Sequence, residues 1–151
     1  MNGKTAATAI IGAGLLAGAA MYYLQVYAFY DRLPDTTVLR VVTETGQDPL
    51  SLSDFDGIDA ASSPLRFRAC AKLADPTEIA HAKSAEKPEP LTAPGWFSCF
   101  NAAEIGDALS RGEAKAYVSE TEIHPGVDRV IAVYPDGRAF AWHQLNGTLE
   151  N

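Results

Sequence analysis

Residues 127–143, VDRVIAVYPDGRAFAWH, contain the pattern that decides the fold. Two runs rich in β-branched, aromatic and small apolar residues, Val127–Tyr134 and Arg138–His143, flank Pro135-Asp136-Gly137. Glycine tolerates the positive φ that tight turns need, so this arrangement predicts a β-hairpin. Val130–Val133 is apolar throughout, which indicates a strand in the middle of a sheet.

An amphipathic helix is expected before this hairpin. Asn101 and Glu104 have the spacing of a capping box, and Gly112 supplies a stop. Between them lies an apolar stripe at helical spacing: Ala102, Ile105, Ala108 and Leu109. A strand over 114–119 then leads to the hairpin.

Two further strands and a helix are expected nearer the amino terminus. Thr36–Thr43 is rich in β-branched residues. Leu65–Ala71 alternates, which predicts a half-buried strand with Arg66, Arg68 and Cys70 on its polar face. Pro76–Lys83 fits a short helix capped by Asp75. Residues 44–63 and the proline-rich segment 84–94 are expected to be mainly loop, the latter mobile.

This order of elements predicts an α+β domain over residues 36–151. We expect a small antiparallel sheet of about five strands with two helices on one face. The size is sufficient for an ordinary core without help from metals or disulfides.

The amino-terminal segment has the composition of a membrane span. No side chain from Thr5 to Tyr30 is charged, and about twenty apolar residues cross a bilayer core of ~30 Å. We expect a cytoplasmic terminus over 1–5, a transmembrane helix over 6–27 and an interfacial linker over 28–35. Aromatic residues at the end of the span fit an interfacial belt: Tyr22, Tyr23, Tyr27, Phe29 and Tyr30.

A cleaved signal peptide is the main alternative for this segment, and a buried helix of a soluble protein is a lesser one. Lys4 makes a weak basic start, and Ala17-Gly18-Ala19 offers a cleavage pattern. Because the apolar run continues beyond that pattern, a retained anchor is favoured. The positive-inside rule then predicts the amino terminus in the cytoplasm and, in a bacterium, the domain in the periplasm.

Small residues recur every four positions along the span. They are Gly14 and Gly18 on one stripe, and Ala9, Ala13 and Ala17 on another. Such stripes let helices pack closely in lipid, against another integral membrane protein or a second copy of the chain. The other interpretation is that alanine and glycine are simply common in weakly hydrophobic anchors.

Charge excludes one class of partner. The net charge is −7, and all nineteen acidic residues follow the span. Binding to nucleic acid phosphates needs a basic surface, so we expect no nucleic acid partner.

The two cysteines, Cys70 and Cys99, are expected to follow the span into an oxidising compartment. An even pair there is first interpreted as a disulfide. Two buried thiols, or a redox or metal role, remain open; a metal site would combine these cysteines with His124 and His143.

Catalytic motifs are not evident. The third histidine, His81, has no metal-ligand spacing to the others, and there is no Cys-x-x-Cys or Gly-x-Ser-x-Gly pattern. We therefore expect no cofactor, and a non-enzymatic role is favoured.

The segment 94–100, PGWFSCF, concentrates three aromatic side chains in seven residues. Trp96, Phe97 and Phe100 are either core residues or, together with Tyr27 and Tyr30, candidates for an interface near the membrane or a partner.

The chain resembles an uncharacterised alphaproteobacterial family of single-span, membrane-anchored proteins with a domain of unknown function, number 6446. The resemblance covers nearly the whole chain and rests on YYLQVYAFY (22–30), RFRAC (66–70), PGWFSCFNAAEIGDAL (94–109) and IHPGVDRVIAVYPDGRAFAWHQLN (123–146). It implies one span, a small extracytoplasmic domain and no established activity. No functional residue can be transferred from it.

The favoured function is that of a membrane-anchored periplasmic accessory or assembly protein. It would bind a complex in the bacterial inner membrane through its span, its domain or both. The alternative is a periplasmic thiol-redox or metal-handling protein that uses Cys70 and Cys99.

Overall fold

The first element is the helix α1, Gly3–Val26, in the computed structural model, which describes residues 2–150. The Asn2 side chain caps its start by accepting a hydrogen bond of 2.9 Å from the Thr5 N–H. None of the helix residues is buried. Among the described residues it is the one helix long and apolar enough to cross a membrane. It lies in a unit of its own, Met1–Tyr30, and Asp31–Asn151 forms a second unit.

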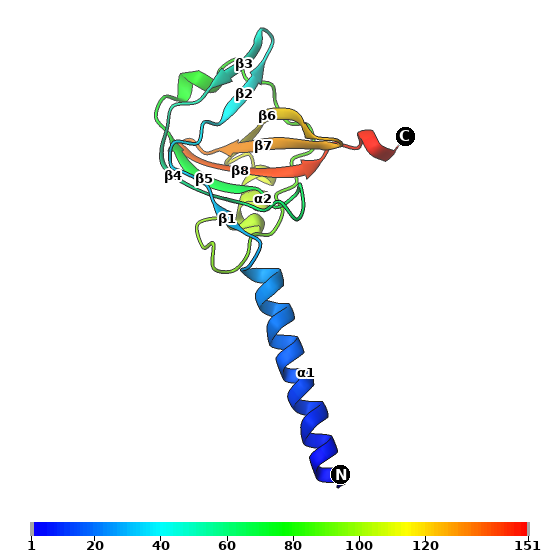
Figure 1. The fold of residues 1–151 in the computed structure, drawn as a ribbon. Coiled ribbons are helices and arrows are strands. Elements are labelled where there is room, and N and C mark those ends of the chain that lie inside the picture. The colour runs from blue at the N-terminus through cyan, green and yellow to red at the C-terminus, as the bar shows by residue number, and fades with distance from the viewer. Residues whose placement is uncertain (1, 151) are drawn as a thin grey trace. The chain divides into compact units, whose positions relative to one another are not determined.

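The second unit is built on a six-stranded antiparallel sheet (Figure 1). In spatial order the strands are β1 (Asp31–Arg32), β4 (Leu52–Asp59), β5 (Arg68–Leu73), β8 (Arg138–Leu145), β7 (Val127–Val133) and β6 (Lys115–His124). A separate hairpin pairs β2 (Arg40–Thr43) with β3 (Gly46–Pro49). The helices of this unit are α2 (Ala102–Ser110) and the 3-10 helices η1 (Pro76–Ile79) and η2 (Thr148–Glu150). The α+β prediction is confirmed, with one strand more in the sheet than expected and a hairpin besides.

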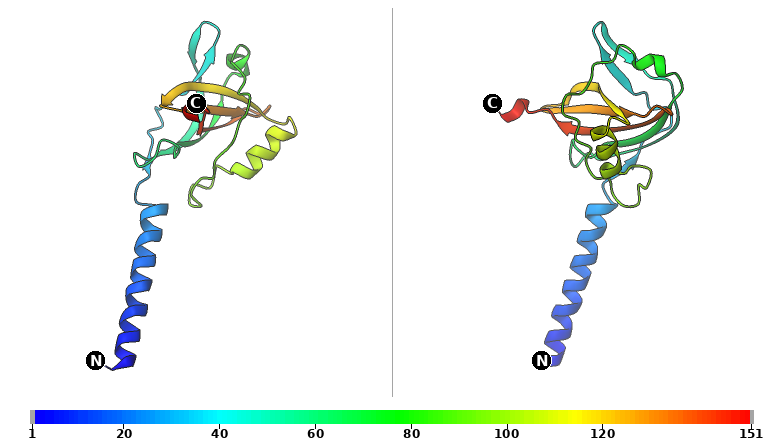
Figure 2. Two further views of the ribbon diagram at one scale, coloured as in Figure 1. Left: turned by 90° about the vertical axis from the view of Figure 1, so that its right-hand side faces the viewer. Right: turned by 180° about the vertical axis from the view of Figure 1, so that it is seen from behind.

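The helix α2 covers one face of the sheet (Figure 2). Cys70, Phe140 and Ala132 lie opposite one another in register on β5, β8 and β7, and so share this face. Phe140 packs against a cluster that contains Ala108 of α2 and Tyr134. The polar face expected of β5 is therefore buried.

The β2–β3 hairpin and its flanking residues cover the opposite face. Ala69, Ala141 and Ile131 lie in register there. The core on this side also contains Leu39, Val41, Leu50, Phe67, Leu73, Val133 and Ala139. The sheet thus separates two apolar layers, which explains why the middle strands are apolar on both sides.

The predicted turn and helix caps are confirmed. Gly137 has φ of +91° and its N–H donates to the Tyr134 carbonyl at 3.0 Å, which closes the β7–β8 hairpin. A side chain at Gly137 would place a carbon 3.0 Å from the Leu73 carbonyl oxygen. The Asn101 side chain accepts a 3.2 Å hydrogen bond from the Glu104 N–H and starts α2.

The strands β3 and β4 both lie in residues 44–63, which were expected to be mainly loop. The longer strand, β4, shows why the pattern was missed. Its apolar residues Leu52, Phe55 and Ile58 are three apart, which disguises the two-residue period of a strand. The cause is a β-bulge between Ser53 and Asp56, where Asp54 has φ of +51°.

Two other elements differ from the predicted bounds because of particular hydrogen bonds. The first expected strand loses its start because Thr37 donates through both its N–H and its hydroxyl to the Pro34 carbonyl, which forms a turn. The expected helix over 76–83 shortens to η1, since Lys83 N–H instead donates to Val42 at 2.7 Å. Ile79 of η1 packs with the hairpin-side core. Hence η1 and α2 lie on opposite faces rather than on one.

Candidate functional site

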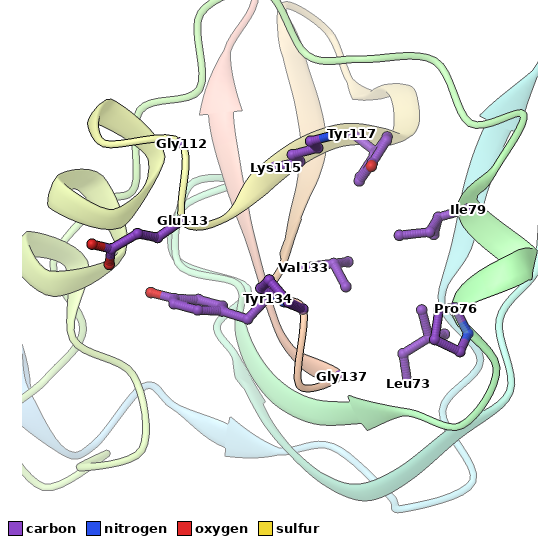
Figure 3. A pocket seen from close by; sticks show the side chains of 11 residues that line it. Leu73, Pro76, Ile79, Gly112, Glu113, Lys115, Tyr117, Val133, Tyr134 and Gly137 are labelled. Carbon is purple, nitrogen blue, oxygen red and sulfur yellow. The ribbon is translucent and has the colours of Figure 1, made fainter.

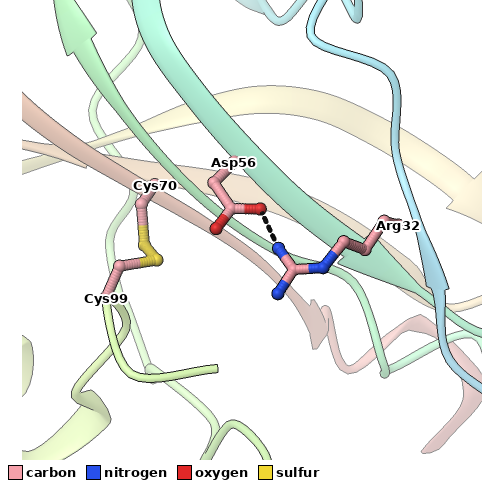
Figure 4. Close-up of a disulfide and its surroundings, with 4 residues drawn as sticks. All are labelled: Arg32, Asp56, Cys70 and Cys99. Carbon is pink, nitrogen blue, oxygen red and sulfur yellow. Dashed lines mark hydrogen bonds and ion pairs between the residues drawn. A yellow bond between two sulfur atoms is a disulfide. The ribbon is translucent and has the colours of Figure 1, made fainter. Parts of the chain in front are cut away.

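The two cysteines are joined in a disulfide (Figure 4). Cys70 lies in β5 and is buried, whereas Cys99 is exposed in the segment just before α2. The bond ties the centre of the sheet to the start of the helix that covers it. This is the pairing that the even cysteine count favoured.

The four residues considered as metal ligands do not form a ligand set. The sulfurs of Cys70 and Cys99 are bonded to each other, so neither is a thiolate. The rings of His124 and His143 have centroids 6.0 Å apart. Within residues 2–150 no group of three or more histidine, cysteine, aspartate or glutamate side chains is arranged to hold a metal ion.

His143 is a buried structural histidine. Its Nδ1 lies 2.6 Å from the Pro64 carbonyl oxygen, and its Nε2 accepts a hydrogen bond of 3.1 Å from Arg129. The ring therefore carries its proton on Nδ1. Burial lowers the pKa of His143 from 6.5 to about 4, so the side chain is neutral near pH 7.

Arg68 is a buried cation that the strand pattern placed on a polar face. It is 4 % exposed, and its guanidinium donates to four carbonyl oxygens, those of Leu65, Phe67, Leu91 and Thr92. The last two belong to the proline-rich segment that was expected to be mobile. Gln144 holds the same segment by donating to the Lys87 carbonyl and accepting from the Glu89 N–H, both at 2.8 Å. At its start, the Ala85 N–H donates to the Ala116 carbonyl of β6 at 2.9 Å. The segment is thus anchored to the sheet along its length.

The aromatic residues of segment 94–100 divide between core and surface. Phe97 and Phe100 are 2 % and 5 % exposed, so neither is available to a partner. Trp96 is partly exposed, and the Arg32 guanidinium lies 5.7 Å from its ring centroid. Arg32 also pairs with Asp56 at 2.6 Å.

The remaining interface and packing candidates lie in the amino-terminal unit. Tyr27 is 43 % exposed and stacks on Tyr23 with centroids 6.0 Å apart; Tyr30 is partly exposed. At Gly14 and Gly18 the place where a side chain would begin has no atom within 4 Å apart from the neighbouring residues and backbone of the helix itself. The alanines of the second stripe are exposed as well: Ala9, Ala13 and Ala17.

An apolar cavity of about 210 Å³ opens where β5 ends and β6 begins (Figure 3). Leu73, Ile79, Tyr117 and Val133 contribute to its wall, and burial raises the pKa of Tyr117. Its lining comes from segments far apart in the sequence. No local pattern could therefore have revealed it.

Comparison with known proteins gives a family but no activity. The family of unknown function DUF6446 matches residues 37–151, which contain nearly all of the second unit. No curated protein and no solved structure matches the chain.

Proposed function

Because the chain belongs to the family of unknown function DUF6446, we propose a role from its own residues: a membrane-anchored accessory or assembly protein that binds a membrane complex and is not an enzyme. The observation that carries the proposal is a helix of membrane-spanning length, none of whose residues is buried, joined to a separately packed unit. A helix that is apolar all round needs lipid or another protein around it.

The anchor is proposed to cross the bacterial inner membrane once, over residues 6–27. At a rise of ~1.5 Å per residue, the 24 residues of α1 extend about 36 Å, enough for a ~30 Å hydrocarbon core. Lys4 favours a cytoplasmic amino terminus, and the domain after the span is then periplasmic. A disulfide is consistent with that oxidising compartment.

A binding role is consistent with the bonding of the cysteines and of the buried histidine in the domain. Cys70 and Cys99 are bonded to each other, and both ring nitrogens of His143 have hydrogen-bond partners. The domain instead offers the apolar cavity near Tyr117 as a place for an apolar group of a partner. In the span, the stripe with Gly14 and Gly18 suits close helix packing.

The test is crosslinked pulldown of the full chain in mild detergent. Gly14→Leu combined with Gly18→Leu should leave the protein in the membrane and reduce recovery of an integral membrane partner. Gly12→Leu is a matched control, since it lies about 160° around the helix from Gly14. Failure of the native chain to recover any membrane protein would sink the proposal. Recovery of a second copy of this chain and no other membrane protein would show that the partner is the chain itself, in a homodimer.

If the chain with Gly14→Leu and Gly18→Leu recovers the partner as well as the native chain and the Gly12→Leu control do, the span only tethers the domain to the membrane. The partner would then bind the domain.

A thiol-redox role is the second candidate, because Cys99 of the disulfide is exposed. It requires a disulfide that a mild dithiol reduces while the domain is folded. Non-reducing mass spectrometry after alkylation measures this directly. A bond that survives mild reductant eliminates the candidate.

A further inference from the structure

We propose that the loop Pro90–Ser98, here called the Trp96 loop, rests on the lipid headgroup layer, with Trp96 as an interfacial anchor. The occupant of this surface is lipid rather than protein. The inference rests on the proposed membrane insertion of α1 and adds a second membrane contact to it.

The covalent chain keeps this loop close to the end of the span. Only residues 27–30 separate the end of α1 from β1. Six residues from Val26 to Arg32 reach on the order of 20 Å when fully extended. Arg32 in turn contacts Trp96, with its guanidinium over the ring and 5.7 Å from the ring centroid. The chain therefore permits Trp96 to reach the headgroups when α1 is inserted.

The composition of the loop suits this contact. No charged side chain occurs from Pro90 to Ala103, although the second unit carries nineteen acidic and eleven basic residues, a net charge of −8. An anionic leaflet repels such a domain wherever carboxylates face it. The Trp96 loop presents none of its own, and Arg32 beside it adds a cation.

The loop is also held rigidly, so that Trp96 needs no ordering on contact. Arg68 donates to the carbonyls of Leu91 and Thr92 at 2.8 and 3.1 Å. The Phe97 N–H donates to Pro94 at 2.9 Å, and the buried Phe97 ring fixes the next position. The disulfide at Cys99 ties down the far end. A preorganised tryptophan loses little entropy when it binds.

Tryptophan itself is suited to this layer. Its ring has a large apolar body and an N–H donor, and such rings gather at headgroup depth. Trp96 is one of two tryptophans, and the other, Trp142, is fully buried. A quencher in the surroundings of the protein can therefore reach the ring of Trp96 but not that of Trp142, and this separates the emission of the two.

The test is fluorescence of the full chain reconstituted into anionic vesicles with brominated lipids. Bromine near the headgroups should reduce the emission of the native protein, and this loss should disappear in Trp96→Phe, where only Trp142 remains. A matched control moves the tryptophan to the exposed turn of the β2–β3 hairpin, which lies at the other end of the second unit (Figure 1), as Trp96→Phe with Thr45→Trp. Its emission should be red-shifted and unquenched.

The failures are distinguishable. If alkaline extraction removes the chain from the vesicles, the proposed anchor is wrong. If the chain is retained but native and Trp96→Phe proteins are quenched alike, the anchor stands and the lipid contact is refuted. Equal quenching of the Trp96 and Thr45→Trp reporters refutes it too, since the domain then has no preferred face.

Discussion

Arg129, Phe67 and His143 form one stack at the residue scale. The Arg129 guanidinium lies 4.1 Å from the Phe67 ring centroid, and the rings of Phe67 and His143 are parallel within 15° at 4.6 Å. Glu120 pairs with Arg129 at 3.4 Å. Burial is the main cause that lowers the pKa of His143, and the positive charge of Arg129 acts in the same direction. The stack is built for a neutral imidazole.

We expect this imidazole to make the domain less stable as the pH falls from 6.5 to about 4. Between these values the unfolded chain binds a proton at His143 and the folded chain does not, so the free energy of unfolding decreases by about 3 kcal/mol across the window. Above pH 6.5 both states are neutral and this contribution is flat. Urea unfolding at several pH values measures the slope.

His143→Gln is the control for this slope. It removes the titrating group, so the variant should lack this part of the pH dependence whatever its stability near neutral pH. Parallel pH profiles for the two proteins would contradict the assignment.

At the scale of elements, the sequence predicted the helices and strands that are marked by residues close together in the chain, such as a turn or a helix cap. The β7–β8 hairpin follows from a turn in which Gly137 adopts positive φ, and α2 follows from its cap at Asn101. The strand β4 was missed because the bulge at Asp54 breaks its period. The helix expected over 76–83 was too long because Lys83 bonds to β2, a contact that no local pattern encodes.

Some features of the candidate sites could be predicted from the sequence, and others depend on contacts between distant segments. The pairing of Cys70 with Cys99 was predicted from their even number and from the oxidising compartment expected for them. The burial of Arg68 and the lining of the cavity depend on segments that meet only in the folded domain. The aromatic segment 94–100 could be singled out from the sequence, but not which of its rings is exposed. The partner of Trp96, Arg32, lies 64 positions earlier in the chain.

Reduction of the disulfide is expected to lower the free energy of unfolding by about 3–4 kcal/mol. The bond closes a loop of 29 residues, and the chain-entropy model assigns that much to a loop of this size. Urea unfolding with and without a phosphine reductant measures the difference. Cys70→Ala combined with Cys99→Ala is the control, and its stability should not respond to the reductant. A native protein equally stable in both conditions would show that the bond contributes nothing.

At the scale of the whole molecule, the two apolar layers of the sheet belong to the second unit. None of the residues of α1 is buried. The disulfide lies in the second unit as well. Helix α1 thus supplies no residue to either of these core clusters.

We therefore expect the fragment 31–151 to fold without α1. Its near-ultraviolet circular dichroism and its urea unfolding midpoint should match those of the full chain in the same mild detergent. A fragment that shows no cooperative unfolding would mean that the amino-terminal helix contributes to the core.

The position of β8 has a consequence for how the protein is made. The strand nearest the carboxyl terminus lies between β5 and β7, so the two halves of the sheet meet only through it. A chain that emerges amino end first exposes Cys70 and Cys99 well before residues 138–145 arrive. In an oxidising compartment, the two sulfurs can therefore bond while the sheet is still open, before the last strand is available to join its two halves.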